Sequence, residues 1–238
     1  METNLFLSKL TLNQRSCEAR RDLADCHDLH RTIMSAFPQA DGAAAREEFG
    51  VLFRVETGRD GKVILLVQSQ VEPDWSRLPE GYLLEADRNP TCKPVSGHYA
   101  GLETGQRLLF RLLANPTKRV SAKNTEEDAR WRGKRIELRR EEDQIAWLRR
   151  RGEAAGFRLL AARVNRDVPN VQTAPRPKTS GWREKSRLSF GSALFNGELE
   201  ITDADRFRQA LSDGFGSGKA YGFGLLSIAP ISAGRGAE

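Results

Sequence analysis

The sequence predicts an α+β protein that contains two tandem ferredoxin-like domains, each with the RRM-like element order βαββαβ. Short strand-like runs of apolar residues alternate with helical patterns, and this order occurs once in each half of the chain. A length of 238 residues also fits two domains of roughly 100 residues each. We place the domains at residues 1–115 and 134–238, joined by a polar linker at 116–133 that lacks apolar periodicity.

The first half is expected to contain one clear helix and four strands. Leu29, Ile33 and Phe37 follow one another at four-residue intervals, which predicts an amphipathic helix over 22–37. An Asp-Gly pair between two β-branched runs indicates a hairpin. The second helix is not visible in the Pro- and Gly-rich residues 71–104, so we expect it to be short or replaced by a loop. The strands are expected at 4–12, 51–56, 62–69 and 107–114.

The second half repeats the pattern. Ile145 and Leu148 face inward in the first of two expected helices, and Asp203 and Asp205 suit the positive N-terminal end of the second. A polar, basic stretch that contains prolines separates two of the strands. The helices are expected at 141–151 and 203–212, and the strands at 134–138, 157–164, 188–195, 198–202 and 225–231.

Basic residues exceed acidic ones by 38 to 32, which gives a formal net charge of +6. A positive balance favours a polyanionic partner such as nucleic acid. The alternative for each basic run is a solvated helix or loop face. The basic residues cluster at 111–123, 130–140, 149–151 and 176–187.

The composition argues against several classes of protein. No apolar run reaches 18 residues, so we expect no transmembrane helix, and the N-terminal residues resemble a strand rather than a signal peptide. Three cysteines, Cys17, Cys26 and Cys92, are odd in number and lack CxxC spacing, which disfavours a disulfide framework or a zinc site. We therefore expect a cytoplasmic protein without a metal or other cofactor.

A glycine-rich run, Gly214-Phe-Gly-Ser-Gly-Lys-Ala-Tyr-Gly-Phe-Gly-Leu-Leu226, lies between a predicted helix and the last strand. Its N–H groups could bond phosphate oxygens. The P-loop pattern GxxxxGK(S/T) fails because Asp213 and Ala220 occupy its first and last positions, and GxGxxG fails because its third glycine is Lys219. We interpret the run as a loop that packs against an RNA backbone or an active site, with a purely structural turn as the alternative. Its candidate contacts are Gly214, Gly216, Gly218 and Lys219.

The chain contains three histidines, and two of them lie on the first predicted helix. The ordinary pKa of histidine, near 6.5, suits proton transfer by His30 at neutral pH. RNA supplies its own nucleophile, the 2′-OH, so one well-placed histidine could act without a metal. A structural or surface role is the alternative. His27 lies one turn earlier on the same face; the pair could bind a metal, but no third ligand is apparent. For His98 we expect no special role.

Short segments that follow one another along nearly the whole chain resemble the CasE family. These are the CRISPR RNA-processing endoribonucleases of type I-E systems, within the wider superfamily of CRISPR repeat-RNA endonucleases. The combination is far more specific than any one segment. The segments are Leu7-Ser-Lys-Leu-Thr-Leu12, Arg20-Arg-Asp-Leu-Ala-Asp25, Leu29-His-Arg-Thr32, Leu66-Val-Gln-Ser69, Pro73-Asp-Trp-Ser76, Phe110-Arg-Leu-Leu-Ala-Asn-Pro-Thr-Lys118, Gly133-Lys-Arg135 and the glycine run to Ala229-Pro230.

The resemblance implies metal-independent cleavage of CRISPR precursor RNA at the base of the repeat hairpin, with a 2′,3′-cyclic phosphate as product. It also implies that the enzyme stays bound to the RNA as a subunit of the Cascade complex. His30 takes the place of the family's catalytic histidine, as general acid or base. His27, Arg31 and Lys185 are candidate helpers. The candidate RNA contacts beyond the glycine run are Lys118, Arg119, Lys134, Arg135, Arg183 and Arg187.

Two positions depart from the family pattern. The family usually has Tyr where this chain has His27, and it has Arg where this chain has Leu113. Two other functions stay open at this point. One is a non-catalytic RNA-binding subunit of the same kind of complex, and the other is a nucleotide-dependent enzyme that uses the glycine run.

Overall fold

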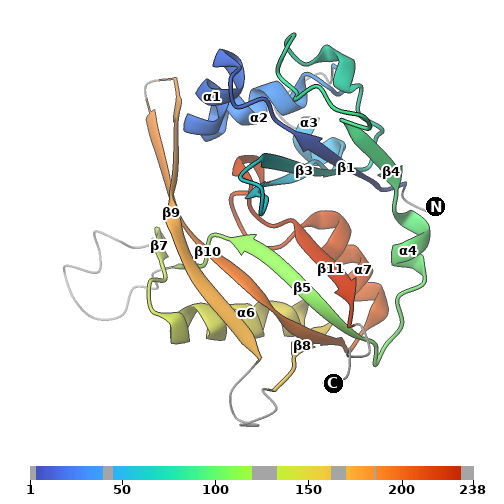
Figure 1. Ribbon diagram of the computed structural model, residues 1–238. Helices are drawn as coiled ribbons and strands as arrows, with labels where there is room; N and C mark the ends of the chain where they lie inside the picture. Colours follow the sequence, from blue (N-terminus) through green and yellow to red (C-terminus); the bar gives the residue numbers. More distant parts are fainter. Residues whose placement is uncertain (1–3, 40–44, 120–132, 162–169, 185, 232–238) are drawn as a thin grey trace, which may run out of the picture.

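The structure is a computed structural model that describes residues 4–39, 45–119, 133–161, 170–184 and 186–231. Most of its strands form two larger antiparallel sheets with helices packed against them, and β6 and β7 form a third, two-stranded sheet (Figure 1). The predicted α+β class is confirmed.

The first sheet has the order β2-β3-β1-β4. Its strands pair antiparallel, and β1 lies between β3 and β4. This is the strand order of a ferredoxin-like unit. Where that unit would have its second helix, the chain forms only the 3₁₀ turn η1 (Trp75–Arg77), which confirms the expected short or missing helix. The strands are β1 (Phe6–Thr11), β2 (Leu52–Thr57), β3 (Val63–Ser69) and β4 (Thr91–Pro94), followed by α4 (Ser96–Ala100).

The second sheet has the order β11-β5-β10-β8, which is again ferredoxin-like. One helix connects β5 to β8 and another connects β10 to β11, so the βαββαβ order is complete. A further strand, β9, extends the sheet by pairing with β10, and β6 pairs with β7. The elements are β5 (Arg107–Ala114), β6 (Thr117–Arg119), β7 (Arg135–Glu137), α6 (Glu141–Ala154), β8 (Phe157–Leu159), β9 (Val171–Arg183), β10 (Ser186–Ile201), α7 (Ala204–Asp213) and β11 (Leu226–Pro230).

Strand pairing assigns one segment differently from the sequence prediction. The predicted boundary at residue 115 left residues 107–114 in the first domain, but β5 pairs with β10 and β11 in the second sheet. The apolar alternation of β5 identifies a strand correctly and carries no information about its partners. By pairing, therefore, β5 is the first strand of the second unit.

The strands expected at 188–195 and 198–202 are one continuous strand, β10, and the stretch before them contains β9. The prolines and basic residues of β9 hide its strand character in the sequence. Because proline lacks an N–H donor, it is tolerated in a strand that pairs on one side, as β9 does with β10. Together β9 and β10 form a long hairpin that extends from the second sheet toward the helices of the first unit (Figure 1).

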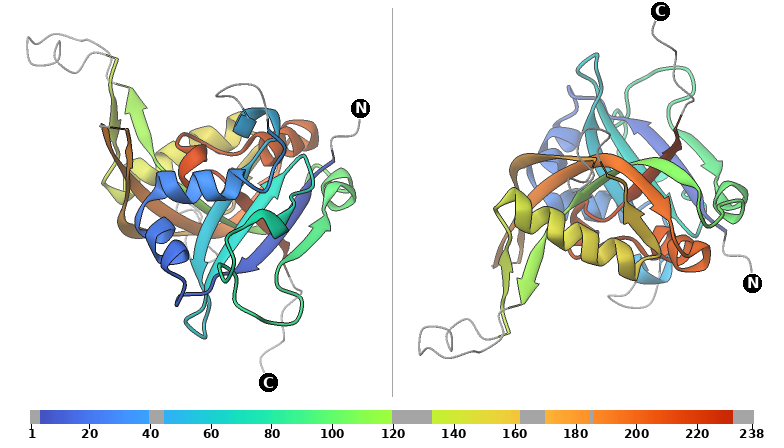
Figure 2. Two further views of the ribbon diagram at one scale, coloured as in Figure 1. Left: turned by 90° about the horizontal axis from the view of Figure 1, so that it is seen from above. Right: turned by 90° about the horizontal axis from the view of Figure 1, so that it is seen from below.

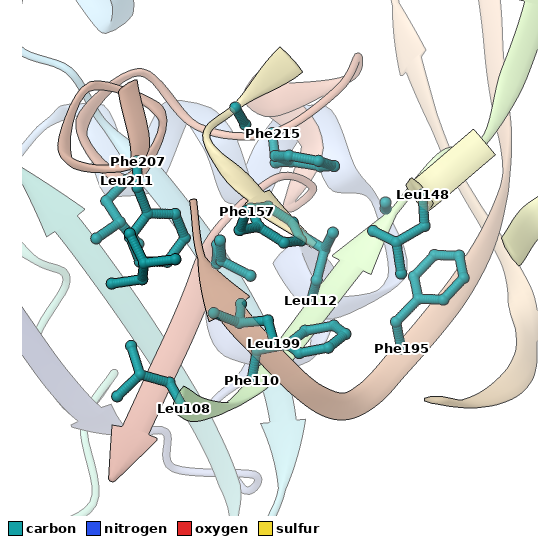
Figure 3. Packing of buried hydrophobic residues seen from close by; sticks show 14 of the residues in the cluster. Leu108, Phe110, Leu112, Leu148, Phe157, Phe195, Leu199, Phe207, Leu211 and Phe215 are labelled. Carbon is teal, nitrogen blue, oxygen red and sulfur yellow. The ribbon is translucent and has the colours of Figure 1, made fainter. Parts of the chain in front are cut away.

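Each unit has its own apolar core. In the second, Phe157 lies between Phe207 and Phe215, with ring centroids 5.6 and 5.7 Å away, and Leu112 of β5 packs beside them (Figure 3). In the first, helix residues such as Leu29 pack against the sheet. Full burial of such a side chain stabilises the folded state by about 1.5–3 kcal/mol. The two cores are therefore the main source of stability.

A polar layer joins the two units. The Arg54 side chain of β2 is almost completely buried and donates hydrogen bonds to the main-chain oxygen of Leu225, at 2.7 Å, and to the hydroxyl of Ser227, at 2.9 Å. Gln68 of β3 donates to the main-chain oxygen of Leu211, at 2.7 Å. Directional hydrogen bonds of this kind fix the position of one sheet relative to the other.

Candidate active site

Two short helices lie where the sequence predicts one helix over 22–37: α1 (Cys17–Ala24) and α2 (Cys26–Met34). Asp25 separates them with an extended backbone, and its carboxylate accepts hydrogen bonds from the N–H groups of His27, at 2.8 Å, and Asp28, at 3.3 Å. An aspartate at this position stabilises the start of a helix. Leu29 and Ile33 bury one side of α2 in the first core, which fixes the orientation of the helix.

The two histidines of α2 lie against a tyrosine from the other half of the chain. The ring centroid of Tyr221 lies 6.5 Å from that of His27 and 6.4 Å from that of His30. Tyr221 belongs to the 3₁₀ turn η2 (Lys219–Tyr221) in the glycine run, which packs against α2 and β2. On its other side Tyr221 stacks on Phe190 of β10, with centroids 4.9 Å apart. The structure therefore joins the two strongest motifs of the sequence, the histidine pair and the glycine run.

Positive charge gathers around His30. Burial, together with the charges of His27 and Arg46, lowers the pKa of His30 from 6.5 to about 4. Burial also lowers the pKa of Lys219, again with a contribution from Arg46. Arg46 lies on α3 (Ala45–Glu48), and the Lys219 ammonium donates to the main-chain oxygen of Asp213 at 2.7 Å. His30 is therefore neutral at neutral pH and lies in a positive field.

One nitrogen of each imidazole is buried. Within the described part of the chain, Nδ1 of His27 and Nδ1 of His30 have no hydrogen-bond partner. A buried polar atom without a partner is unfavourable by about 1–3 kcal/mol, and a functional role is one reason for a protein to retain it.

The β9–β10 hairpin contacts the start of α2. The Asp25 carboxylate, besides capping α2, accepts a hydrogen bond from the main-chain N–H of Trp182 at 2.9 Å. A Cβ added to Gly181 would come within 2.3 Å of the same carboxylate, so only glycine permits this approach. The Trp182 side chain is 57% exposed. The hairpin is therefore attached to the helix that carries the histidines.

The predicted helpers of His30 are not equally close to it. His27 shares the contact with Tyr221, whereas the Arg31 side chain is 72% exposed and pairs with Asp28 at 3.6 Å. Arg31 lines a separate open cavity of about 410 Å³ with Arg21 and Arg77. Lys185 lies outside the described residues.

The predicted RNA contacts form two exposed groups. Arg183 and Arg187 lie on the β9–β10 hairpin, where Arg187 is opposite Trp182. The second group is on the β6–β7 ribbon, which projects from the body of the molecule (Figure 2). It consists of Lys118, Arg119, Lys134 and Arg135.

The glycines of the run have positive φ angles, including 79° at Gly214, 84° at Gly216 and 77° at Gly218. Residues with a Cβ rarely adopt such angles. The directions in which a Cβ would point are filled by Leu52, Trp147 and Phe223, respectively. The fold thus requires these glycines, and Lys219 lies in the turn η2 that packs against α2, with its ammonium bonded to the main-chain oxygen of Asp213.

Sequence reasoning missed Arg46 and Tyr221. Arg46 follows three alanines in a segment without clear periodicity, and Tyr221 was considered only as part of a glycine pattern. The one available hint was the absence of the family's Tyr at His27, which raises the question of which other aromatic residue lies beside His30.

Comparisons with known proteins identify the family of the chain. Residues 5–230 match the model of a family described as CRISPR associated protein. The CRISPR-associated endoribonuclease Cse3 of Thermus thermophilus is 40% identical over 95% of this chain and all of its own length. The Cascade subunit CasE of Escherichia coli K12 is 30% identical over 95% of this chain and all of its own length.

The chain belongs to the CasE family of CRISPR-associated proteins. The resemblance stated from the sequence is confirmed. A solved structure of Thermus thermophilus Cse3, bound to an RNA that represents a pre-cleavage complex, is 40% identical and has a TM-score of 0.75 over 95% of this chain and all of its own. In the described ranges of this CasE-type chain, no helix is long and apolar enough to cross a membrane.

Proposed function

We propose that this CasE-type protein cleaves CRISPR precursor RNA within each repeat, at the base of the hairpin, without a metal ion. It then stays bound to the RNA as part of Cascade. The names of its relatives support an RNA endonuclease of this class. The observation that carries the proposal is the position of His30, whose partly buried imidazole packs against Tyr221 of the glycine run and is kept neutral by burial and by the charges of His27 and Arg46.

In the proposed reaction His30 acts as the general base. Its Nε2 accepts the proton of the 2′-OH, whose oxygen attacks the adjacent phosphorus as the bond to the 5′-oxygen breaks. The departing 5′-oxygen takes a proton from water, and His30 returns its proton to the solvent, so the products are a 2′,3′-cyclic phosphate and a 5′-hydroxyl. In the free protein burial lowers the pKa of His30 and so weakens this base, and the charges of His27 and Arg46 add to the effect. A phosphate bound among them would offset their charge and raise the pKa of His30 toward neutrality.

We assign to Arg46 and Lys219 the stabilisation of the charge that grows on the phosphorane. His27 assists by adjoining the same phosphate. Arg31, being largely exposed, is better suited to a flanking phosphate than to the scissile one. For Lys185 the role of a helper stays a prediction from the sequence.

The exposed basic groups would hold the stem of the hairpin. Arg183 and Arg187 on the β9–β10 hairpin lie nearest to α2, and the four basic residues of the β6–β7 ribbon extend the positive surface. Contacts of this type recognise an A-form stem mainly through its phosphates and shape. The glycine run contributes Lys219 and the main chain at Gly214, Gly216 and Gly218.

The decisive experiment incubates the purified protein with its CRISPR repeat RNA in EDTA. We expect full cleavage by the wild type and loss of at least about a hundredfold in rate for His30→Ala, with hairpin affinity nearly unchanged. His98→Ala is the matched control, because His98 is exposed on α4 and should leave the rate unchanged. Normal cutting by His30→Ala would refute the assignment of His30, and loss of cutting in EDTA would refute metal independence.

The nucleophile can be tested separately. Replacing the ribose just 5′ of the cut by deoxyribose removes the 2′-OH, so we expect no cleavage and no cyclic phosphate end. Continued cutting of this substrate would exclude the proposed reaction.

The main competing function is a non-catalytic RNA-binding subunit. It predicts tight binding of the hairpin and no cleavage by the wild type under any condition. The partly buried histidine pair favours the enzyme, because binding to phosphates alone is served by exposed Arg and Lys side chains and does not need a neutral imidazole.

A further inference from the structure

We propose that Tyr221 is a positioning residue of the active site, whose ring holds His27 and His30 in place and shields His30 from water. This inference rests on the proposed function and names a residue from the second half of the chain on which the reaction depends.

The first observation is the packing of the rings. Tyr221 meets His30 edge to face, with an interplanar angle of 64°, and lies at 51° to His27. Phe190 stacks on Tyr221 at 25°, and Phe223 supports Phe190 with ring centroids 6.0 Å apart. Aromatic pairs prefer such tilted and stacked arrangements. The rings of Tyr221 and Phe190 therefore block movement of either imidazole toward the second sheet.

The second observation is how the main chain holds Tyr221. The turn η2 is bounded by Gly218 and Gly222, both in the left-handed region at φ 77° and 87°. The Tyr221 N–H donates to the main-chain oxygen of Gly218 at 2.8 Å. A Cβ on Gly222 would lie 3.2 Å from the Phe53 ring of β2. The turn is thus seated tightly against β2, and the glycines let the tyrosine reach α2.

The third observation concerns the hydroxyl. Among the described residues the Tyr221 hydroxyl has no hydrogen-bond partner, so its links to the histidines are those of the ring. From other elements, Tyr221 of η2 contacts both histidines, the charge of Arg46 on α3 acts on His30, and β9 offers the main-chain N–H of Trp182 to Asp25. Of these, Tyr221 is the one that can exclude water without adding charge at neutral pH.

The test measures the titration of each histidine by NMR in the RNA-free protein, together with single-turnover cleavage rates across pH. In Tyr221→Ala, water reaches His30, so its titration should move up by about one pH unit toward the ordinary value. The maximal rate should fall about tenfold to a hundredfold, because a small misplacement of a reacting group has effects of this size. The affinity for the hairpin should change less than about threefold.

Tyr221→Phe keeps the ring and is the conservative variant that should restore both the titration and the rate. Phe190→Leu removes the support behind the ring and should shift both readouts in the same direction as Tyr221→Ala, by a smaller amount. It keeps the proposal testable if Tyr221→Ala does not fold. His98 titrates in every sample as an internal reference.

Two results would overturn the inference. One is a Tyr221→Ala protein with wild-type His30 titration and rate, and the other is a Tyr221→Phe protein as impaired as Tyr221→Ala, which would assign the role to the hydroxyl. The titration of His30 is measured without RNA. It therefore reports on Tyr221 even if normal cleavage by His30→Ala were to refute the proposed function.

Discussion

His30 shows how the surroundings of a single residue set both its chemistry and its effect on stability. Burial and the neighbouring charges of His27 and Arg46 disfavour its protonated form, so the folded protein keeps it neutral where an unfolded chain would protonate it. The same feature that makes the imidazole available as a base therefore makes the fold sensitive to acid.

This argument predicts how stability depends on pH. The folded-state pKa of His30, about 4, lies below the unfolded value of 6.5, so its contribution is present above pH 6.5 and is lost as pH falls toward 4. At about 1.4 kcal/mol per pKa unit, the loss is at most about 3.5 kcal/mol. Denaturant unfolding of the wild type and His30→Ala at pH 7 and 4.5 measures it.

The difference in stability between pH 7 and 4.5 should be smaller in His30→Ala than in the wild type. His98→Ala, which removes an exposed histidine, should behave like the wild type. Equal acid sensitivity in the wild type and His30→Ala would mean that His30 is not protected from protonation.

At the scale of elements, the β9–β10 hairpin and the start of α2 form one unit through Asp25. Its carboxylate accepts from the N–H groups of His27 and Asp28 within the helix and from that of Trp182 in the hairpin. These bonds hold the pKa of Asp25 below its usual range, although its burial acts most strongly and in the opposite direction. The hairpin that is proposed to hold RNA is thereby coupled to the helix that carries His27 and His30.

Gly181→Ala tests this coupling. The new Cβ would overlap the Asp25 carboxylate, so the hairpin or the helix must shift, and we expect a loss of about 1–3 kcal/mol in stability together with slower cleavage. Gly97→Ala is the matched control, because a Cβ there meets open space. A Gly181→Ala protein that matches Gly97→Ala in unfolding and cleavage assays would show that this contact affects neither stability nor the cleavage rate.

Elements with strong periodicity could be predicted from the sequence, and their partners could not. The spacing of Leu29 and Ile33 predicts the helix that carries His30. The break at Asp25, which divides the predicted helix into α1 and α2, is recognised only in the structure, where Asp25 caps α2. β9 is hidden by its prolines. Tyr221 reaches His30 by tertiary packing from about 190 residues further along the chain. Arg46 acts on His30 from a short helix without clear periodicity. No local sequence pattern predicts either interaction.

At the scale of the whole molecule, the site exists only where the two units meet. His27 and His30 come from the first unit, and Lys219 and Tyr221 come from the second. The geometry therefore depends on the polar layer between the sheets, in which Arg54 has the central place. Besides its bonds to Leu225 and Ser227, its guanidinium pairs with Glu56 at 2.6 Å.

Arg54→Met should weaken this junction, because it leaves the main-chain oxygen of Leu225 without its partner and leaves Glu56 paired with Arg111 alone. Removing one member of a buried ion pair is unfavourable by about 3–5 kcal/mol. Because Glu56 is partly exposed and keeps its pair with Arg111, we expect a loss at or below the lower end of this range. We expect unfolding at a correspondingly lower denaturant concentration and slower cleavage, since His30 and Tyr221 would no longer be held in register. Arg59→Met, in the exposed turn between β2 and β3, removes the same charge without touching the interface. If both variants unfold at the same denaturant concentration, the Arg54 layer does not hold the two units together. The position of His30 relative to Tyr221 must then come from the packing of η2 against α2 and β2 alone.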